Sequence, residues 1–411
     1  MLITVVKNMF RHKWKSLLAI CISFLLILFL FIYLGGLMRN QEELQNLPDT
    51  LPVEGKVVNP NGSWGNGLQI SPGKVQKLER TEKIKDVVKT ADFHIDDSLQ
   101  SFTEEELGKQ NFTVILSSAN SMEAFPYIEA DTVKLAQETS LDFLFGEEAV
   151  CILETGYMKE LGLEFGDTYR ASLYRKKYEG LVQFYELRYV TDIQMTVVGS
   201  YEIDLGSLGN ATAPNVIAPL RYIREAFREV DAPYFVHSMR FTLADALNIN
   251  VFKEEAAEIG FKPRNPQEGM DVVGSALILY DEAFIKTFEQ LNENINLMRL
   301  FAPLVFTAIA LISFLCAFLL MQSRKSELAI MRSLGVSRIG CFLSLLLENL
   351  VLSLIGGLIG FLIGIFGIQS GLQSALMILL LFLLLYLLGA AIAVLFLNRF
   401  SVMAILTKTD E

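Results

Sequence analysis

Residues that commonly build catalytic or metal sites are scarce in this sequence. Its 411 residues include three histidines, His12, His94 and His237, and these are scattered along the chain. No metal-ligand spacing connects them with acidic residues or with a cysteine, and no G-x-x-x-x-G-K-[ST] phosphate-binding loop occurs. The sequence therefore argues against an enzyme and predicts no cofactor or metal on this chain. If ATP drives the protein, another polypeptide must bind the nucleotide.

Cysteine is also rare, with four residues in the whole chain. Cys21, Cys316 and Cys341 fall in or beside apolar runs, and only Cys151 lies between residues 40 and 295. That region therefore has no internal disulfide. About 250 residues are enough to build a hydrophobic core without one.

Charge is missing from three long stretches. No charged residue occurs over the 23 positions of 16–38, the 24 of 300–323 or the 50 of 349–398. A helix that crosses a bilayer needs roughly 20 apolar residues, so the first two stretches predict one span each. The first is too long for the apolar part of a signal peptide, roughly 7–15 residues, and we expect it to be retained. The third divides at polar and glycine residues 367–374. The four expected spans are 16–38, 300–322, 341–367 and 375–397.

The remaining charge is unevenly distributed. Residues 40–295 carry 23 basic and 42 acidic residues, whereas the rest of the chain carries 12 and 4. Short basic flanks of spans stay in the cytoplasm. This rule predicts a multi-pass protein of the cell (plasma or inner) membrane, with both termini and the 323–340 loop cytoplasmic and residues about 40–299 extracytoplasmic. The supporting basic residues are Lys7, Arg11, Lys13, Lys15, Arg324, Lys325, Arg332, Arg338 and Arg399. The acidic region has the wrong sign for binding nucleic acid.

Residues 2–15 mix apolar and basic positions. They suit a helix that lies on the inner leaflet, with anionic lipid beneath its basic residues. The alternative is that these basic residues only flank the first span and fix its topology. Phe10 and Trp14, at helical spacing, favour the surface helix.

Strand-like and helix-like stretches alternate between residues 39 and 280, which predicts a large mixed α/β extracytoplasmic domain. Strand candidates are 112–116, 149–153, 193–201, 215–220, 237–243 and 275–280. Helix candidates are 72–90, 131–139, 154–161, 219–230 and 245–259. The expected fold is thus an α-helical integral membrane protein with four transmembrane helices and this domain between the first and the second.

Residues 281–299 predict a stalk helix that leads into the second span. Its apolar residues are spaced 4, 3, 4 and 3 apart, as in a coiled-coil seam; they are Phe284, Phe288, Leu291, Ile295 and Met298. Leu37, Leu44 and Leu47 form a weaker stripe after the first span. We expect two paired stalk helices that carry the outer domain. Packing of one amphipathic helix on that domain is the alternative.

The segment 324–337 (RKSELAIMRSLGVS), hereafter the elbow, is a short charged stretch between two apolar runs. Residues 324–334 favour a helix, Gly335 can supply the left-handed position that ends it, and Ser337 can cap the next helix. Such an elbow is rigid and can transmit the motion of a partner. The alternative, a solvated basic loop that only fixes topology, cannot.

The third span carries two overlapping G-x-x-x-G units, formed by Gly356, Gly360 and Gly364. Small residues at this spacing let helix backbones approach closely in lipid, either within the chain or across a dimer. Glu348 lies about two turns into the same span. A carboxylate there is costly unless it is paired or near the interface, and Arg332 or Arg338 is its expected partner. A proton relay is a further interpretation of this intramembrane acid.

The elbow, Glu348 and the glycine-rich third span together resemble the conserved module of FtsX-like ABC-transporter permeases, a family that includes MacB and the LolC/LolE proteins. Residues 147–169, followed by MTVVGSY at 195–201, are similar to the MacB-type extracytoplasmic domain, and 5–20 is similar to the start of that family. The resemblance covers both ends of the chain and part of the outer domain. The expected domains are an inner-leaflet helix and first span (1–38), a MacB-like domain (39–280), a stalk helix (281–299) and an FtsX-like permease module (300–411).

The resemblance implies a permease that forms a homodimer, or a heterodimer with a related permease, and binds separate ATPase subunits on the cytoplasmic side. ATP and magnesium would lie on those subunits. The expected coupling residues are Arg324, Lys325, Glu327, Arg332, Gly335 and Ser337, of which all but Lys325 match the family motif. ATPase closure would move the stalks and outer domains, a mode called mechanotransmission. The implied task is export or extraction of a peptide, lipoprotein or hydrophobic compound.

The chain also departs from the family's best-known members. MacB itself carries its ATPase on the same chain, FtsX has a much smaller outer domain, and the lipoprotein-releasing members serve an outer membrane. The cargo is therefore open. A membrane signalling or scaffold protein is the second hypothesis: its outer domain would regulate an extracytoplasmic partner such as a wall hydrolase, and the elbow would only relay state.

Labelling from either side of the membrane tests the predicted orientation. A membrane-impermeant reagent applied to intact cells is expected to modify a reactive residue introduced within 147–169. It is expected to leave one introduced within 324–337 unmodified until the membrane is opened, because basic flanks stay inside. The opposite pattern contradicts the orientation and the coupling that depends on it.

Overall fold

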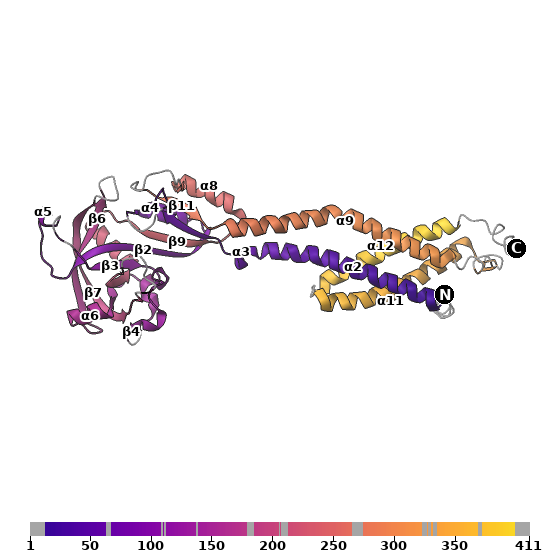
Figure 1. Ribbon diagram of the computed structural model, residues 1–411, viewed down its shortest axis with the longest axis horizontal. Helices are drawn as coiled ribbons and strands as arrows, with labels where there is room; N and C mark the ends of the chain where they lie inside the picture. Colours follow the sequence, from indigo (N-terminus) through magenta and orange to yellow (C-terminus); the bar gives the residue numbers. More distant parts are fainter. Residues whose placement is uncertain are drawn as a thin grey trace. The chain divides into compact units, whose positions relative to one another are not determined.

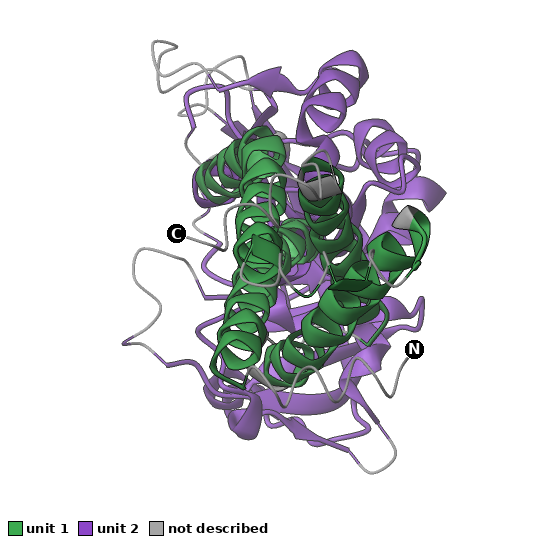
Figure 2. Ribbon diagram, turned by 90° about the vertical axis from the view of Figure 1, so that its right-hand side faces the viewer, with its two compact units in different colours: residues 1–47, 286–411 green, residues 48–285 purple. Residues whose placement is uncertain are grey.

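The computed structural model describes residues 13–398 apart from short gaps, and it divides into two compact units. The helix unit comprises residues 1–47 and 286–411, and the sheet unit comprises residues 48–285 (Figure 2). The gaps are residues 63–66, 108–109, 111, 137–138, 179–184, 205, 207–212, 265–273, 323–326, 328–329, 332–334 and 369–371.

Four helices in the described ranges are long and apolar enough to cross a membrane, as the charge-free runs predict. They are α2 (Lys13–Gln45), α9 (Glu282–Gln322), α11 (Arg338–Ile368) and α12 (Leu372–Asn398) (Figure 1). Each expected span lies inside one of them, and the break expected at 367–374 falls between α11 and α12. In chain order, the sheet unit follows α2 and precedes most of α9.

Large side chains from three of these helices meet in a core. Phe31 of α2, Ile309 of α9 and Phe382 of α12 are buried in one cluster. The outward faces are apolar as well, since Leu304 is 68% exposed and Leu380 is 67% exposed. Such faces are unfavourable in water and typical of helices surrounded by lipid.

The sheet unit contains one mixed sheet of eleven strands. Its strands are β1 (Glu54–Val58), β2 (Ile84–Asp96), β3 (Ile115–Ala119), β4 (Lys134–Leu135), β5 (Val150–Glu154), β6 (Thr168–Tyr178), β7 (Tyr185–Tyr201), β8 (Val216–Pro219), β9 (Ser238–Leu243), β10 (Lys262–Pro263) and β11 (Ala276–Leu279). The connecting helices are α3 (Leu47–Thr50), α4 (Pro72–Glu79), α5 (Glu104–Leu107), α6 (Thr155–Leu161), α7 (Leu220–Glu229) and α8 (Ile249–Ile259). The strand order is β10-β11-β1-β9-β2-β3-β8-β5-β7-β4, and β6 pairs with β2 and β7.

Six strands of this sheet close into a ring. The long strand β2 pairs with β3 through residues 90–94 and with β6 through 94–96. The pairs β3–β8, β8–β5, β5–β7 and β7–β6 complete the circuit. Two register shifts each place one extra residue in β7, Val198 opposite β5 and Val190 opposite β6, and give β7 the local bend that closure requires. Ile152 and Tyr201, both fully buried, belong to the core beside this ring.

Two helix predictions in this unit are wrong. The expected helix at 72–90 ends with α4 at Glu79, and residues 84–96 form β2 instead. Valine is β-branched and favours extended backbone once neighbouring strands can pair with it; β9 and β3 provide them, and Val88 is buried there. The expected helix at 131–139 is a short 3-10 turn (Ala130–Thr132) followed by β4, with 137–138 outside the described residues.

The other predictions in the sheet unit are mostly confirmed. Helices α6, α7 and α8 and strands β5, β8, β9 and β11 lie at the expected positions, apart from a few residues at their ends, whereas β7 begins at Tyr185, well before the expected start at residue 193. The strand expected at 112–116 is displaced to β3, and β1 and β6 were not predicted. The hydrophobic pattern did not predict strand β6, because Arg175, Lys176 and Lys177 interrupt its apolar positions.

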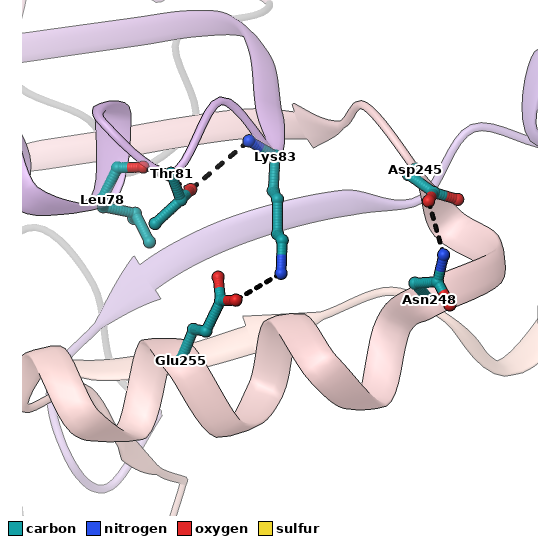
Figure 3. Close-up of polar contacts among 6 residues, drawn as sticks. All are labelled: Leu78, Thr81, Lys83, Asp245, Asn248 and Glu255. Carbon is teal, nitrogen blue, oxygen red and sulfur yellow. Dashed lines mark hydrogen bonds and ion pairs between the residues drawn. The ribbon is translucent and has the colours of Figure 1, made fainter.

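Polar contacts fix the link between α4 and β2 (Figure 3). Thr81 Oγ1 donates to the carbonyl O of Leu78 at 2.7 Å, and it accepts from the backbone N of Lys83 at 3.3 Å. The Lys83 ammonium forms an ion pair with Glu255 of α8. At the start of α8, Asn248 Nδ2 donates to Asp245 Oδ2 at 2.7 Å. These contacts hold α8 beside the beginning of β2.

Thiol labelling tests the burial of Cys151 in β5. Its side chain is fully buried, and burial raises the pKa of its thiol to about 12. Because thiolate is the reactive form, we expect no modification of Cys151 by a maleimide at pH 8 in the native protein and complete modification after unfolding. A variant Leu99→Cys, at a position 45% exposed, is the positive control. Rapid native labelling of Cys151 contradicts this fold.

Candidate coupling site

A glycine ends the helical part of the elbow. Gly335 has φ of +88°, the left-handed region that disfavours side chains with a Cβ. The backbone N of Val336 donates to the carbonyl O of Met331 at 3.1 Å, which is the 6→1 hydrogen bond of a Schellman motif. Gly335 therefore occupies the left-handed position that the sequence predicts for it.

The next helix begins with a serine cap. Ser337 Oγ accepts from the backbone N of Gly340 at 3.1 Å, so it satisfies an N–H that has no partner within the helix. The carbonyl O of Ser337 accepts from the backbone N of Cys341 at 3.1 Å, the first hydrogen bond of α11. Two residues therefore define the turn between the elbow and α11, as the sequence predicts.

The basic residues of the elbow cannot be placed. Arg324, Lys325 and Arg332 lie outside the described residues, whereas Glu327 is described in a helical turn and is half-buried. Their contact with an ATPase stays a prediction. Ile330, also in the elbow, was not among the predicted coupling residues, and the structure shows it 55% exposed. An apolar residue inside a charged segment was the available signal for it.

The glycines of the third span pack against α2 of the same chain. A Cβ added at Gly356 would lie 2.5 Å from the carbonyl O of Ile20, and one at Gly364 would lie 2.7 Å from the ring of Phe31. Gly360 lies against Ile27 in the same way. Side chains cannot occupy these positions without separating the helices. Of the two alternatives that the G-x-x-x-G spacing left open, the structure shows packing within the chain.

A second glycine contact joins α12 to α9. A Cβ at Gly389 would lie 2.8 Å from the backbone N of Phe314 and 2.9 Å from Ser313 Cβ. Gly357 of α11 lies against Phe382 of α12, at 3.3 Å by the same measure. The sequence analysis missed Gly389, although small residues follow it at Ala390 and Ala393 and signal a close helix contact.

Glu348 is buried in the helix unit, with 6% of its surface exposed. Its expected partners cannot be tested, because Arg332 and the side chain of Arg338 lie outside the described part of the structure. The next residue, Asn349, is also buried, and its Nδ2 donates to the carbonyl O of Leu345 at 3.0 Å. Two polar residues of α11 are thus enclosed at the end nearest the elbow.

The predicted seam of α9 coincides with its least exposed face. Phe284 and Ile295 are buried, and Phe288, Leu291 and Met298 are half-buried, while most of their neighbours are exposed. Phe284 belongs to the sheet unit and the other four belong to the helix unit. The seam meets α2 at Met298, which contacts Tyr33 and Asn40.

Two of the three histidines, His94 and His237, come closer together than the sequence indicates, and His12 lies outside the described residues. His237 Nδ1 accepts from the backbone N of Asp92 at 2.9 Å, and His94 lies two residues along β2, beside Phe112 O at 3.1 Å. Burial lowers the pKa of both imidazoles, and the Asp92 carboxylate opposes that shift. Within the described residues, no group of three or more His, Cys, Asp and Glu side chains is arranged to hold a metal ion.

No protein-family model matches this chain, and a search of curated proteins found no similar sequence. The functional argument therefore depends on the geometry described above. That geometry forms a continuous set of contacts. The elbow leads directly into α11, the glycine seam joins α11 to α2, and Gly389 joins α12 to α9.

Substitution of glycine by alanine at two positions tests the seam. Gly360→Ala is expected to lower the melting temperature in detergent by roughly 2–6 °C, because its new methyl group collides with Ile27. The matched control is Gly36→Ala in α2, where a Cβ would lie 3.6 Å from its nearest neighbour and fits. That control is expected to be neutral or stabilising, since alanine favours helix over glycine. Equal melting temperatures for the two variants contradict the seam.

Proposed function

We propose that this chain is the membrane-spanning permease subunit of an ABC-type transporter whose ATP hydrolysis takes place on a separate polypeptide. The observation that carries the proposal is the elbow itself. It has a Schellman stop at Gly335 and a serine cap at Ser337, so the turn from Gly335 into α11 has a defined backbone. A segment of defined shape transmits displacement, whereas a chain without such contacts absorbs it.

The helices supply two routes from the elbow. One follows α9, which continues as a single helix from Gln322 back to Glu282. The other follows α11 and crosses to α2 through Gly356, Gly360 and Gly364. In the proposed function, the elbow lies in the cytoplasm against the ATPase, and movement along both routes reaches the sheet unit outside the membrane. Transport by this mode needs no channel through the helix unit.

The proposed partners follow from the same arrangement. Each chain has one elbow, so two copies, identical or related, would engage two ATPase subunits, which hold ATP and magnesium. The substrate class is a peptide, lipoprotein or hydrophobic compound that is exported or extracted. The resemblance of the elbow, Glu348 and the third span to FtsX-like permeases supports this choice over a signalling role.

Co-purification with a candidate ATPase, such as the product of an adjoining gene, tests the proposal. Gly335→Val is expected to reduce recovery of the ATPase at least several-fold, because valine strongly disfavours φ of +88° and the elbow must change shape. Glu327→Lys is expected to act in the same direction through charge. Lys262→Glu, an exposed change at a sheet edge, is the control and should retain the ATPase.

Two results would contradict the permease assignment. One is ATPase recovery and ATP-dependent transport that stay unchanged in both elbow variants. The other is a chain that binds no ATPase but controls the activity of a wall hydrolase, which would favour the signalling alternative.

A further inference from the structure

Helix α9 contains a proline in the middle of its length. Pro303 has no N–H to donate to the carbonyl group four residues earlier, that of Arg299. Thr307 Oγ1 also donates to the carbonyl O of Pro303 at 2.7 Å, a type of side-chain bond that tends to bend helices. The helix therefore has its weakest backbone hydrogen bonding between residues 299 and 307, which makes this the place where it bends most easily.

On the C-terminal side of Pro303, α9 is packed firmly in the helix unit. Gly389 of α12 brings the two backbones together at Ser313 and Phe314. Ile309 is fully enclosed in the cluster that α2, α9 and α12 share. Movement of this part of α9 would open the core, so residues 304–322 belong to the rigid part of the unit.

On the N-terminal side, α9 is attached to α2 by a small cluster, hereafter the Met298 clasp. Its members are Tyr33, Gly36, Asn40 and Met298. The Tyr33 hydroxyl donates to the carbonyl O of Met298, and Asn40 Nδ2 lies 4.0 Å from the sulfur of Met298. Gly36 leaves room for the Met298 methyl group, since a Cβ there would lie 3.6 Å from Met298 Cε.

The clasp is weak beside the packing that it adjoins. A neutral hydrogen bond shifts an equilibrium only roughly 2- to 10-fold, and Met298 is a flexible side chain that adapts to different neighbours. Leu297 and Leu300, which flank Met298 in the sequence, are 52% and 72% exposed and add little contact, so Ile295, at 3% exposed, is the main buried apolar side chain near the clasp. The easily bent part of α9 around Pro303 thus lies between the firmly packed residues 304–322 and the weaker contact at the Met298 clasp.

We infer that Pro303 is a hinge in α9 and that the Met298 clasp is its releasable attachment. When the clasp opens, residues 286–302 swing away from α2 while 304–322 stay packed. This inference goes beyond the proposed function, because the two states exist whether or not an ATPase acts on the elbow. Within that function, the hinge is where movement along α9 would diverge from movement along α2.

Distance measurement between two spin labels tests the clasp. The labels are attached at Glu42→Cys and Asn292→Cys, two exposed positions on α2 and α9, in the full-length protein with Cys21, the exposed native cysteine, replaced by alanine. In the parent protein, most molecules are expected to show a short distance between the labels, and a minor population is expected to show a longer one. Tyr33→Phe, which removes only the hydroxyl, should raise the long-to-short ratio roughly 2- to 10-fold. Tyr280→Phe, at a residue 60% exposed, is the matched control and should leave the ratio unchanged.

The hinge is tested in the same labelled protein. Pro303→Ala restores the backbone N–H and should confine the distances to the short population, even when it is combined with Tyr33→Phe. Gly36→Leu tests the clasp without altering the hydrogen bond. The leucine side chain displaces Met298 and should favour the long distance. The alanine of Gly36→Ala fits beside Met298 and should leave the distances unchanged. A Tyr33→Phe distribution identical to that of the parent overturns the clasp. A long population that persists in the Pro303→Ala, Tyr33→Phe double variant overturns the hinge.

Loss of ATPase binding is scored separately by co-purification. The hinge can therefore fail while the proposed function stands, and the reverse also holds.

Discussion

The helix unit depends on the close approach of α11 to α2. At Gly356 the two backbones are so near that no side chain fits between them, and at Gly360 the side chain of Ile27 occupies the space that a Cβ would need. In an apolar environment the hydrophobic effect gives helices little reason to associate, and close contact between backbones replaces it. The seam also joins segments more than three hundred residues apart in the chain. It therefore holds the helix that follows the elbow against the helix that precedes the sheet unit.

This constraint gives the elbow its significance. A stop at Gly335 and a cap at Ser337 would be ordinary features between two independent helices. Here the second helix is held against α2, because its glycines lie directly against the backbone at Ile20 and the side chains of Ile27 and Phe31. The first helix, α9, is held at Gly389 in the same way but contains Pro303 further along. The two helices that flank the sheet unit in the sequence thus differ in stiffness.

Sequence reasoning was strongest where one physical rule decides the outcome. Charge-free runs locate the four apolar helices, and the geometry of glycine and serine at helix ends locates the elbow turn at Gly335 and Ser337. It failed in the sheet unit, where pairing with strands distant in the sequence determines the secondary structure. Residues 84–90 of β2 were assigned to a helix because only β9 and β3, distant in the sequence, make the extended form favourable. The sequence also left open which helix packs against the glycine seam. The G-x-x-x-G spacing predicts a close contact with another helix but does not say which helix makes it.

The strand order of the sheet has a consequence for self-association. The chain of strands ends at β10 and β4. Each of these is two residues long, and β10 contains Pro263, which has no N–H to offer. Exposed strand edges are the usual template for unwanted aggregation. At these two ends, the described residues offer a foreign strand only a very short stretch of backbone, so copies of the acidic sheet unit have little opportunity to polymerise there.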